Sequence, residues 1–227
     1  MKILYLIPAR AGSKGLPGKN TKMLGDKPLI AYSINFAINN VKEGDEICIS
    51  TNDERVLDLA TKLGLEVPFV RPEELASDTA KSYDVIMHAI NYYENNNKHF
   101  DLVLLLQPTS PFRSQEDFKK LIESYEDHIE MVVSVKESKE NPYFTLFEEN
   151  EHGFLDKSKK GDFHRRQDSP QVFAFNGSMY LMKVSALKDK SISEFKRIKK
   201  IIMPEERSID IDTLADWALA EFYLEKQ

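Results

Sequence analysis

A glycine-rich, cationic loop follows the first apolar run of the chain. Residues 3–7 are apolar, and residues 8–20 then combine three glycines and a hydroxyl with three cations, namely Arg10, Lys14 and Lys19. Glycines let backbone N–H groups approach phosphate oxygens, and guanidinium and ammonium groups add charge-assisted hydrogen bonds. We therefore predict that this loop, including Gly12 and Ser13, holds a triphosphate. The alternative is a basic surface loop without a ligand.

Two familiar glycine motifs do not fit this loop. An ATPase loop would need Gly, four residues and then Gly-Lys-Ser/Thr, but Gly12 and Gly18 are one residue too far apart and Asn20 follows the lysine. A dinucleotide fingerprint needs Gly-x-Gly-x-x-Gly, whereas these glycines are spaced by threes. The loop is therefore a phosphate site of another kind.

Two acids near the C-terminus could bind a metal. Asp210 and Asp212 are separated by one residue, so in an extended segment their side chains point to the same side. Paired carboxylates that face phosphates suit Mg²⁺, with Mn²⁺ as a second possibility. The alternatives are a pair of surface acids, or an Asp212 that serves the N-terminus of the last helix. The five histidines are scattered and indicate no competing metal site.

Strand-like and helix-like segments alternate along the chain. Apolar runs of strand length occur at residues 2–7, 46–50, 101–106, 131–135 and 178–182. Helical periodicity occurs at residues 28–40, 53–63, 81–96, 115–126 and 213–225, with Pro28 at a first helical position. This order predicts a doubly wound α/β fold with a mostly parallel sheet, in which ligands bind at the carboxyl ends of strands and at the switch point of strand order.

Residues 136–170 interrupt this alternation. They are polar and mixed in charge, and they contain Asn141-Pro142, Gly153 and Gly161. We expect one domain over residues 1–227 with an inserted arm at 136–170. The arm is either an extended hairpin used for dimer contact or a solvated surface excursion.

Composition excludes several classes of protein. The 227 residues are 41% apolar and 30% charged, which is typical of a soluble globular chain, and no apolar run is long enough for a membrane helix. The net charge of −6 argues against a nucleic-acid binder, yet residues 1–30 hold six cations against one acid and so carry +5. A local positive field suits a small polyanion. The single cysteine, Cys48, predicts a buried thiol in a reducing cytoplasm.

Five ordered blocks resemble the CMP-sialic acid synthetase family, the cytidylyltransferases of acylneuraminates and other nonulosonates. The first is the Ala-Arg-x-x-Ser-Lys-Gly-x-x-x-Lys-Asn run at residues 9–20. The others are Arg71-Pro-Glu-Glu-Leu-Ala-Ser-Asp-Thr-Ala-Lys-Ser82, Leu106-Gln-Pro-Thr-Ser-Pro-Phe-Arg113, Asn176-Gly-Ser-Met-Tyr180 and Ser208-Ile-Asp-Ile-Asp-Thr213. The resemblance implies a nucleotide-diphospho-sugar transferase-like fold and a homodimer.

The resemblance also implies roles in binding CTP. Arg10, Lys14 and Lys19 would hold its phosphates, and the residues around cytidine would be Asn20, Arg71, Ala80 and Ser82. Two alternatives stay open: Arg71 could form a surface ion pair with Glu73 or Glu74, and residues 77–79 could cap the following helix.

For the sugar, the resemblance implies Gln107, Asn176 and Tyr180. In the arm, Arg166 is preferred over Lys136 and Arg165 as the partner of the sugar carboxylate. The residues Thr109, Ser110 and Arg113 could either contact the ligand or shape its loop, and two neighbouring prolines favour shaping.

The implied reaction joins CMP from CTP to the anomeric hydroxyl of a nine-carbon 2-keto-3-deoxy sugar acid and releases pyrophosphate. The catalytic residues would be Arg10, Lys19, Asp210 and Asp212, with Mg²⁺ held by the two aspartates. Alternatives are a cytidylyltransferase for the eight-carbon sugar Kdo or for another sugar, and a non-catalytic nucleotide-binding regulator.

Overall fold

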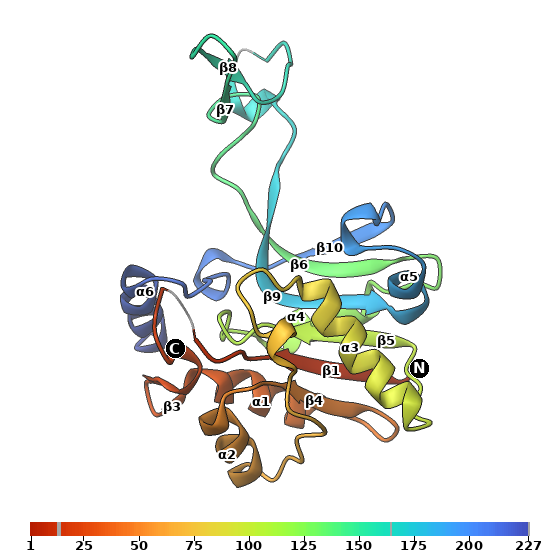
Figure 1. The fold of residues 1–227 in the computed structure, drawn as a ribbon. Helices are drawn as coiled ribbons and strands as arrows, with labels where there is room; N and C mark the ends of the chain where they lie inside the picture. Colours follow the sequence, from red (N-terminus) through yellow and green to blue (C-terminus); the bar gives the residue numbers. More distant parts are fainter. Residues whose placement is uncertain (13–14, 164, 227) are drawn as a thin grey trace.

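A six-stranded sheet forms the centre of the computed structural model, which describes residues 1–12, 15–163 and 165–226 (Figure 1). The strand order is β10-β6-β9-β5-β1-β4. β1 is parallel to β4 and β5, β10 is parallel to β6, and β9 is antiparallel to both of its neighbours. The strands span β1 Ile3–Pro8, β4 Glu46–Ser50, β5 Leu102–Leu106, β6 Met131–Glu137, β9 Phe173–Lys183 and β10 Ile198–Ile202. The predicted doubly wound, mostly parallel sheet is confirmed.

Helices cover both faces of this sheet because successive side chains of a strand point to opposite sides. Ile3, Tyr5 and Ile7 of β1 pack in one core cluster with α1, α2 and α4. Leu4 and Leu6 pack in another with α3 and α5. A third cluster joins α6 to the loop after β1. The helices span α1 Leu29–Asn40, α2 Glu54–Lys62, α3 Ser82–Asn95, α4 Gln115–Glu123, α5 Val184–Asp189 and α6 Leu214–Leu224.

The remaining elements are short. Two small antiparallel pairs are β2 (Met23–Leu24) with β3 (Lys27–Pro28) and β7 (Phe147–Glu149) with β8 (Leu155–Lys157). The 3-10 turns are η1 Lys19–Thr21, η2 Glu73–Leu75, η3 Arg166–Asp168, η4 Ile192–Glu194 and η5 Glu205–Arg207. None of the helices in the described part of the chain is long and apolar enough to cross a membrane.

Most predicted elements are present, with two differences. Pro28 is not the first helical residue: it pairs with Met23 in the β2–β3 ladder, and α1 begins at Leu29. The sequence reading also omitted β10 and α5. β10 is an edge strand in which Lys199 and Lys200 separate the isoleucines, so it lacks the continuous apolar run of a central strand. Cys48 is buried, as predicted, and burial raises the pKa of its thiol to about 12.

The switch point of strand order lies at β1 and β5. From β1 the chain crosses by α1 to β4 on one side, and from β4 it crosses by α2 and α3 to β5 on the other side. The loops after β1 and β5 therefore leave the sheet in different directions, which opens a crevice at their carboxyl ends.

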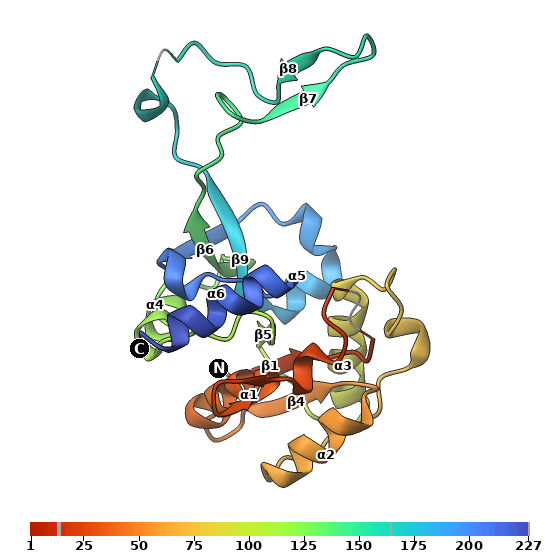
Figure 2. The ribbon, with the colours of Figure 1, turned by 90° about the vertical axis from the view of Figure 1, so that its left-hand side faces the viewer.

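An arm projects from the sheet between β6 and β9. The two strands stay paired up to Glu137 and Phe173, and Ser138 continues the ladder by donating its N–H to the Val172 carbonyl. Beyond this point the chain extends away from the body and carries the β7–β8 hairpin (Figures 1 and 2). Dimer contact through this arm stays a prediction.

Candidate active site

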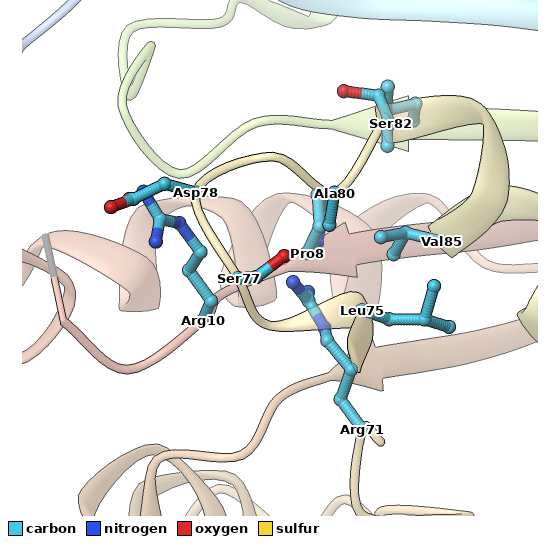
Figure 3. A pocket seen from close by; sticks show the side chains of 10 residues that line it. Pro8, Arg10, Arg71, Leu75, Ser77, Asp78, Ala80, Ser82 and Val85 are labelled. Atoms are coloured by element: carbon cyan, nitrogen blue, oxygen red, sulfur yellow. The ribbon is translucent and has the colours of Figure 1, made fainter. Parts of the chain in front are cut away.

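Two adjoining cavities occupy the crevice at the switch point. The first, of about 280 Å³, lies between the loop after β1 and the segment before α3 (Figure 3). The second, of about 440 Å³, lies between the same loop, the loop after β5 and the segment before α6. Pro8 and Arg10 line both cavities, so the two form one continuous cleft.

The loop after β1 is fixed to the loop after β4. The Ala9 N–H donates to the Ser50 carbonyl at 2.9 Å, and the Ala11 N–H donates to Asn52 Oδ1 at 2.8 Å. Gly12 follows with φ at +75°, a left-handed conformation that favours glycine. Two predicted phosphate contacts, Ser13 and Lys14, lie outside the described residues.

The same loop lies directly against the acidic segment near the C-terminus. A Cβ added to Gly15 would lie 2.2 Å from the carbonyl oxygen of Asp212, so this close approach requires glycine. Lys19 is buried, and its Nζ donates to the Ile211 carbonyl at 2.8 Å and to Asp212 Oδ1 at 2.6 Å. The predicted cationic turn and the predicted acid pair are therefore adjacent.

The acid pair has the predicted alternation. Ile209 and Ile211 are buried, while Asp210 and Asp212 face the second cavity. Partial burial raises the pKa of Asp210, and a hydrogen bond from Thr109 opposes this shift. The carboxylate still reaches solvent through the open cleft.

Asp212 is not the N-cap of the last helix. The cap of α6 is Thr213, whose hydroxyl accepts from the Asp216 N–H at 3.2 Å, and the Asp216 carboxylate accepts from the Thr213 N–H in return. The capping alternative for Asp212 is therefore wrong, because Thr213 and Asp216 form a complete capping box and the Asp212 carboxylate is bonded to Lys19.

The donor set of this cavity fits Mg²⁺. It offers the carboxylate oxygens of Asp210 and Asp212, with the Thr109 hydroxyl beside the first. Within the described ranges no group of three or more His, Cys, Asp or Glu side chains could hold a metal alone. A site of two carboxylates completed by substrate phosphates and water is the usual arrangement for Mg²⁺.

Arg71 lies in the first cavity and is only 4% exposed. Its Nε donates to Ser50 Oγ at 3.0 Å, and its Nη2 donates to the Ser50 carbonyl. Burial, with a smaller effect of Arg10, lowers the pKa of Arg71 to about 10. The alternative of a surface ion pair with Glu73 or Glu74 is wrong, because the guanidinium is buried and bonded to Ser50.

The other predicted cytidine residues lie nearby. Ala80 and Ser82 line the first cavity with Arg71, and Asn20 lines the second, where its Nδ2 donates to the Arg10 carbonyl at 3.3 Å. Residues 77–79 do not cap α3, since its N-cap is Lys81 without a capping side chain.

A protein-family model described as "Cytidylyltransferase" matches residues 4–217. The chain belongs to the cytidylyltransferase family. It is accordingly a CTP-dependent nucleotidyltransferase.

Several relatives of this cytidylyltransferase are similar over almost its whole length. CMP-N,N'-diacetyllegionaminic acid synthase of Legionella pneumophila is 34% identical over 226 residues, which are 99% of this chain and 97% of that protein. Pseudaminic acid cytidylyltransferase of Campylobacter jejuni is 31% identical over 97% of this chain and 95% of its own. N-acylneuraminate cytidylyltransferase of Streptococcus agalactiae is 35% identical over 96% of this chain, but only 52% of that protein is covered.

A solved structure of CMP:2-keto-3-deoxy-manno-octonic acid synthetase complexed with CTP has the same fold as this cytidylyltransferase. Its TM-score is 0.71 at 17% identity, with 100% of this chain and 99% of that chain covered.

On the sugar side of the cytidylyltransferase, Gln107 lies at the end of β5 and lines the second cavity. A Cβ added to Gly177 would lie 2.7 Å from Gln107 Oε1, so the glycine leaves room for this side chain. Tyr180 is partly buried, and its ring meets Phe175 edge-on at 5.9 Å. Burial raises the pKa of Tyr180, and the nearby charge of Asp210 adds to this shift.

Asn176 is not placed for direct contact with the sugar. It is 2% exposed, its Oδ1 accepts from Ser134 Oγ at 2.7 Å, and its Nδ2 donates to Ser208 Oγ at 2.9 Å. Because both ends of the amide are bonded inside the protein, the predicted sugar contact of Asn176 is not supported. The side chain instead ties β9 to β6 and to the segment that leads to the acid pair.

Replacing Asn176 by alanine is expected to lower the free energy of unfolding by about 2–3 kcal/mol, because it leaves buried hydroxyl groups without partners. The matched variant Gln107→Ala should instead keep its stability and raise the KM for the acceptor sugar. Urea unfolding together with steady-state kinetics measures both effects. An Asn176→Ala protein of normal stability with a raised acceptor KM would contradict this assignment.

The loop after β5 is shaped by buried polar groups. Arg113 donates to the carbonyls of Ser178 at 2.9 Å and Gln107 at 2.5 Å, and to Ser33 Oγ at 2.9 Å. Burial lowers the pKa of Arg113 to about 9. Ser110 is fully buried and donates to the Asn176 carbonyl. Shaping therefore describes Arg113 and Ser110, whereas Thr109 lines the cavity beside Asp210.

The arm residues lie elsewhere in the chain. Arg165 forms a bidentate ion pair with Asp168 at 2.9 Å, and Lys136 lines a separate cavity of about 630 Å³ at the base of the arm. The side chain of Arg166 lies outside the described residues. No residue of 136–170 is among the described residues that line the two cavities of the cleft.

Proposed function

We propose that this cytidylyltransferase transfers CMP from CTP to the anomeric hydroxyl of a nine-carbon 2-keto-3-deoxy sugar acid. The observation that carries the proposal is the continuous cleft in which a pocket with a buried arginine leads to a cationic turn bonded to an acid pair. The relatives named for legionaminic, pseudaminic and N-acylneuraminic acids support this class of acceptor.

Cytosine would occupy the first cavity. The Arg71 guanidinium is a fork of donors that suits the O2 and N3 acceptors of cytosine. The exocyclic amine would donate to Ser82 or to a backbone carbonyl beside Ala80, both of which line this cavity. Its bonds to Ser50 fix the orientation of Arg71 before the base arrives.

The triphosphate would extend into the second cavity. The anomeric oxygen attacks the α-phosphorus, the bond from this phosphorus to the bridging oxygen breaks, and pyrophosphate leaves. Negative charge grows on the nonbridging and leaving oxygens, so the positioned cations Arg10 and Lys19 stabilise the transition state. Asp212 holds the Lys19 ammonium in place at 2.6 Å.

Asp210 and Asp212 would hold Mg²⁺, or Mn²⁺, on the side of the cavity opposite the loop after β1. When bound, the metal supplies Lewis acidity to the α-phosphate and lowers the pKa of the attacking hydroxyl. Gln107 and Tyr180 would orient the sugar at the end of the cleft next to this acid pair.

The sugar carboxylate needs a cation, which Arg166 of a second copy would supply. A homodimer is also supported by exposed apolar side chains on the arm and on α6. Phe154 and Leu155 on the arm are 70% and 67% exposed, and Leu214 and Phe222 of α6 are 70% and 46% exposed. Apolar surface of this extent usually belongs to an interface. We place this dimeric enzyme in the cytoplasm.

A pyrophosphate-release assay with CTP and Mg²⁺ tests the proposal. The acceptors are N-acetylneuraminate, legionaminate, pseudaminate, deaminated nonulosonate and Kdo. We expect turnover with at least one of the nine-carbon acids and at most slow turnover with Kdo. Turnover with Kdo alone would contradict the acceptor class, and CTP binding without pyrophosphate release on any acid sugar would instead support a nucleotide-binding regulator.

A further inference from the structure

An acidic side chain lies at the junction of the two cavities. Asp78, in the segment before α3, accepts an ion pair from Arg10, with 2.6 Å between Asp78 Oδ1 and Arg10 Nη2. The two side chains are 39% and 35% exposed. Nothing in the proposed chemistry of phosphate transfer needs a carboxylate here, and a negative charge beside a triphosphate is unfavourable unless it binds something itself.

The first cavity changes in character from one end to the other. Figure 3 shows Leu75 and Val85 at one end, Arg10 and Asp78 side by side at the other, and Arg71 between them. The apolar end with Arg71 suits a base. The opposite end opens toward the second cavity, because Arg10 lines both. A nucleoside triphosphate that spans the cleft therefore places its ribose beside Asp78.

We propose that Asp78 binds the 2′- and 3′-hydroxyls of the ribose and so selects ribonucleotides over deoxyribonucleotides. This inference rests on the proposed function. An ionised carboxylate has two acceptor oxygens and no donor, which matches the two donors of a vicinal diol. Carboxylates read ribose hydroxyls in the same way in dinucleotide-binding folds. The Arg10 guanidinium offsets the charge of Asp78 next to the phosphates.

The competing explanation is that Asp78 only orients Arg10. A half-exposed ion pair of this kind contributes about 0.2–1 kcal/mol, so the fold does not depend on it. Substitutions at Asp78 should therefore yield folded protein, and the two explanations differ in what they predict for nucleotides that lack one hydroxyl.

The experiment compares kcat/KM for CTP, 2′-deoxy-CTP and 3′-deoxy-CTP in the wild-type enzyme, Asp78→Ala and Asp78→Asn. We expect the wild type to prefer CTP and Asp78→Ala to lose about ten- to a hundredfold with CTP, the effect of a charge-assisted hydrogen bond. The deoxynucleotides should lose less, so that the preference largely disappears. Asp78→Asn, with one acceptor oxygen, should fall between the two.

Asp84→Asn is the matched control, because Asp84 is exposed in the first turn of α3 and its removal changes the charge equally. Three outcomes would overturn the inference: equal losses for CTP and the deoxynucleotides, no loss in either Asp78 variant, or a wild type without ribose preference. If the wild type releases no pyrophosphate with any nonulosonate, the proposed function fails, and calorimetric Kd values for the same nucleotides then decide the role of Asp78.

Discussion

Replacing Asp210 by asparagine is expected to lower kcat by about a hundred- to a thousandfold without unfolding the protein. The Asp210 carboxylate lines the cavity opposite Lys19 and accepts from Thr109, so it faces the place where the α-phosphate would lie. Asparagine keeps the shape of the side chain but removes the charge that would hold a divalent cation. Steady-state kinetics with CTP and saturating acceptor measures the loss.

Stability should move in the opposite direction. Because the folded state raises the pKa of Asp210, it disfavours the ionised carboxylate, and this cost is present above the raised pKa and disappears as the pH falls through it. Asp210→Asn should therefore keep or raise the Tm at neutral pH, and kcat of the wild type should fall as Asp210 is protonated. Asp58→Asn, an exposed position in α2, is the control for both measurements. Near-normal turnover of Asp210→Asn would remove Asp210 from the catalytic residues.

Replacing Lys19 by methionine should lower kcat/KM for CTP by about a hundred- to a thousandfold. The ammonium is buried and is bonded to the Ile211 carbonyl and to Asp212, so its loss removes a positioned cation and leaves Asp212 without this partner. Methionine has a similar volume, which limits the change in packing.

Lys22→Met is the matched control for this variant. Lys22 lies three residues further along, is exposed, and its ammonium is 4.0 Å from the centre of the Trp217 ring. It should keep its kinetics with CTP. If Lys19→Met binds and turns over CTP as the wild type does, Lys19 has only a structural role.

The fold was predictable where burial leaves a continuous apolar run. β1 and β5 are buried along their lengths, and their residues are apolar almost throughout. β10 was not predictable in this way, since an edge strand with one exposed side tolerates Lys199 and Lys200. The arm was recognised only as an interruption, because its residues pack mainly on one another.

The site was predictable where a local pattern carries the chemistry. Glycines and cations in one loop, and aspartates two residues apart, are properties of neighbouring residues. Asn176 differs, because its partners Ser134 and Ser208 are 42 and 32 residues away and only the folded chain shows that its amide is fully bonded. The ion pair of Asp78 with Arg10 likewise joins segments that the sequence does not relate.

Anomalous diffraction from crystals grown with CTP and Mn²⁺ tests the central claim most directly. We predict a manganese peak in the second cavity, about 2.1–2.3 Å from a carboxylate oxygen of Asp210 or Asp212 and in contact with a phosphate oxygen of CTP, with cytosine beside Arg71. A manganese peak remote from both aspartates, or CTP bound outside the cleft between the loops after β1 and β5, would contradict the account.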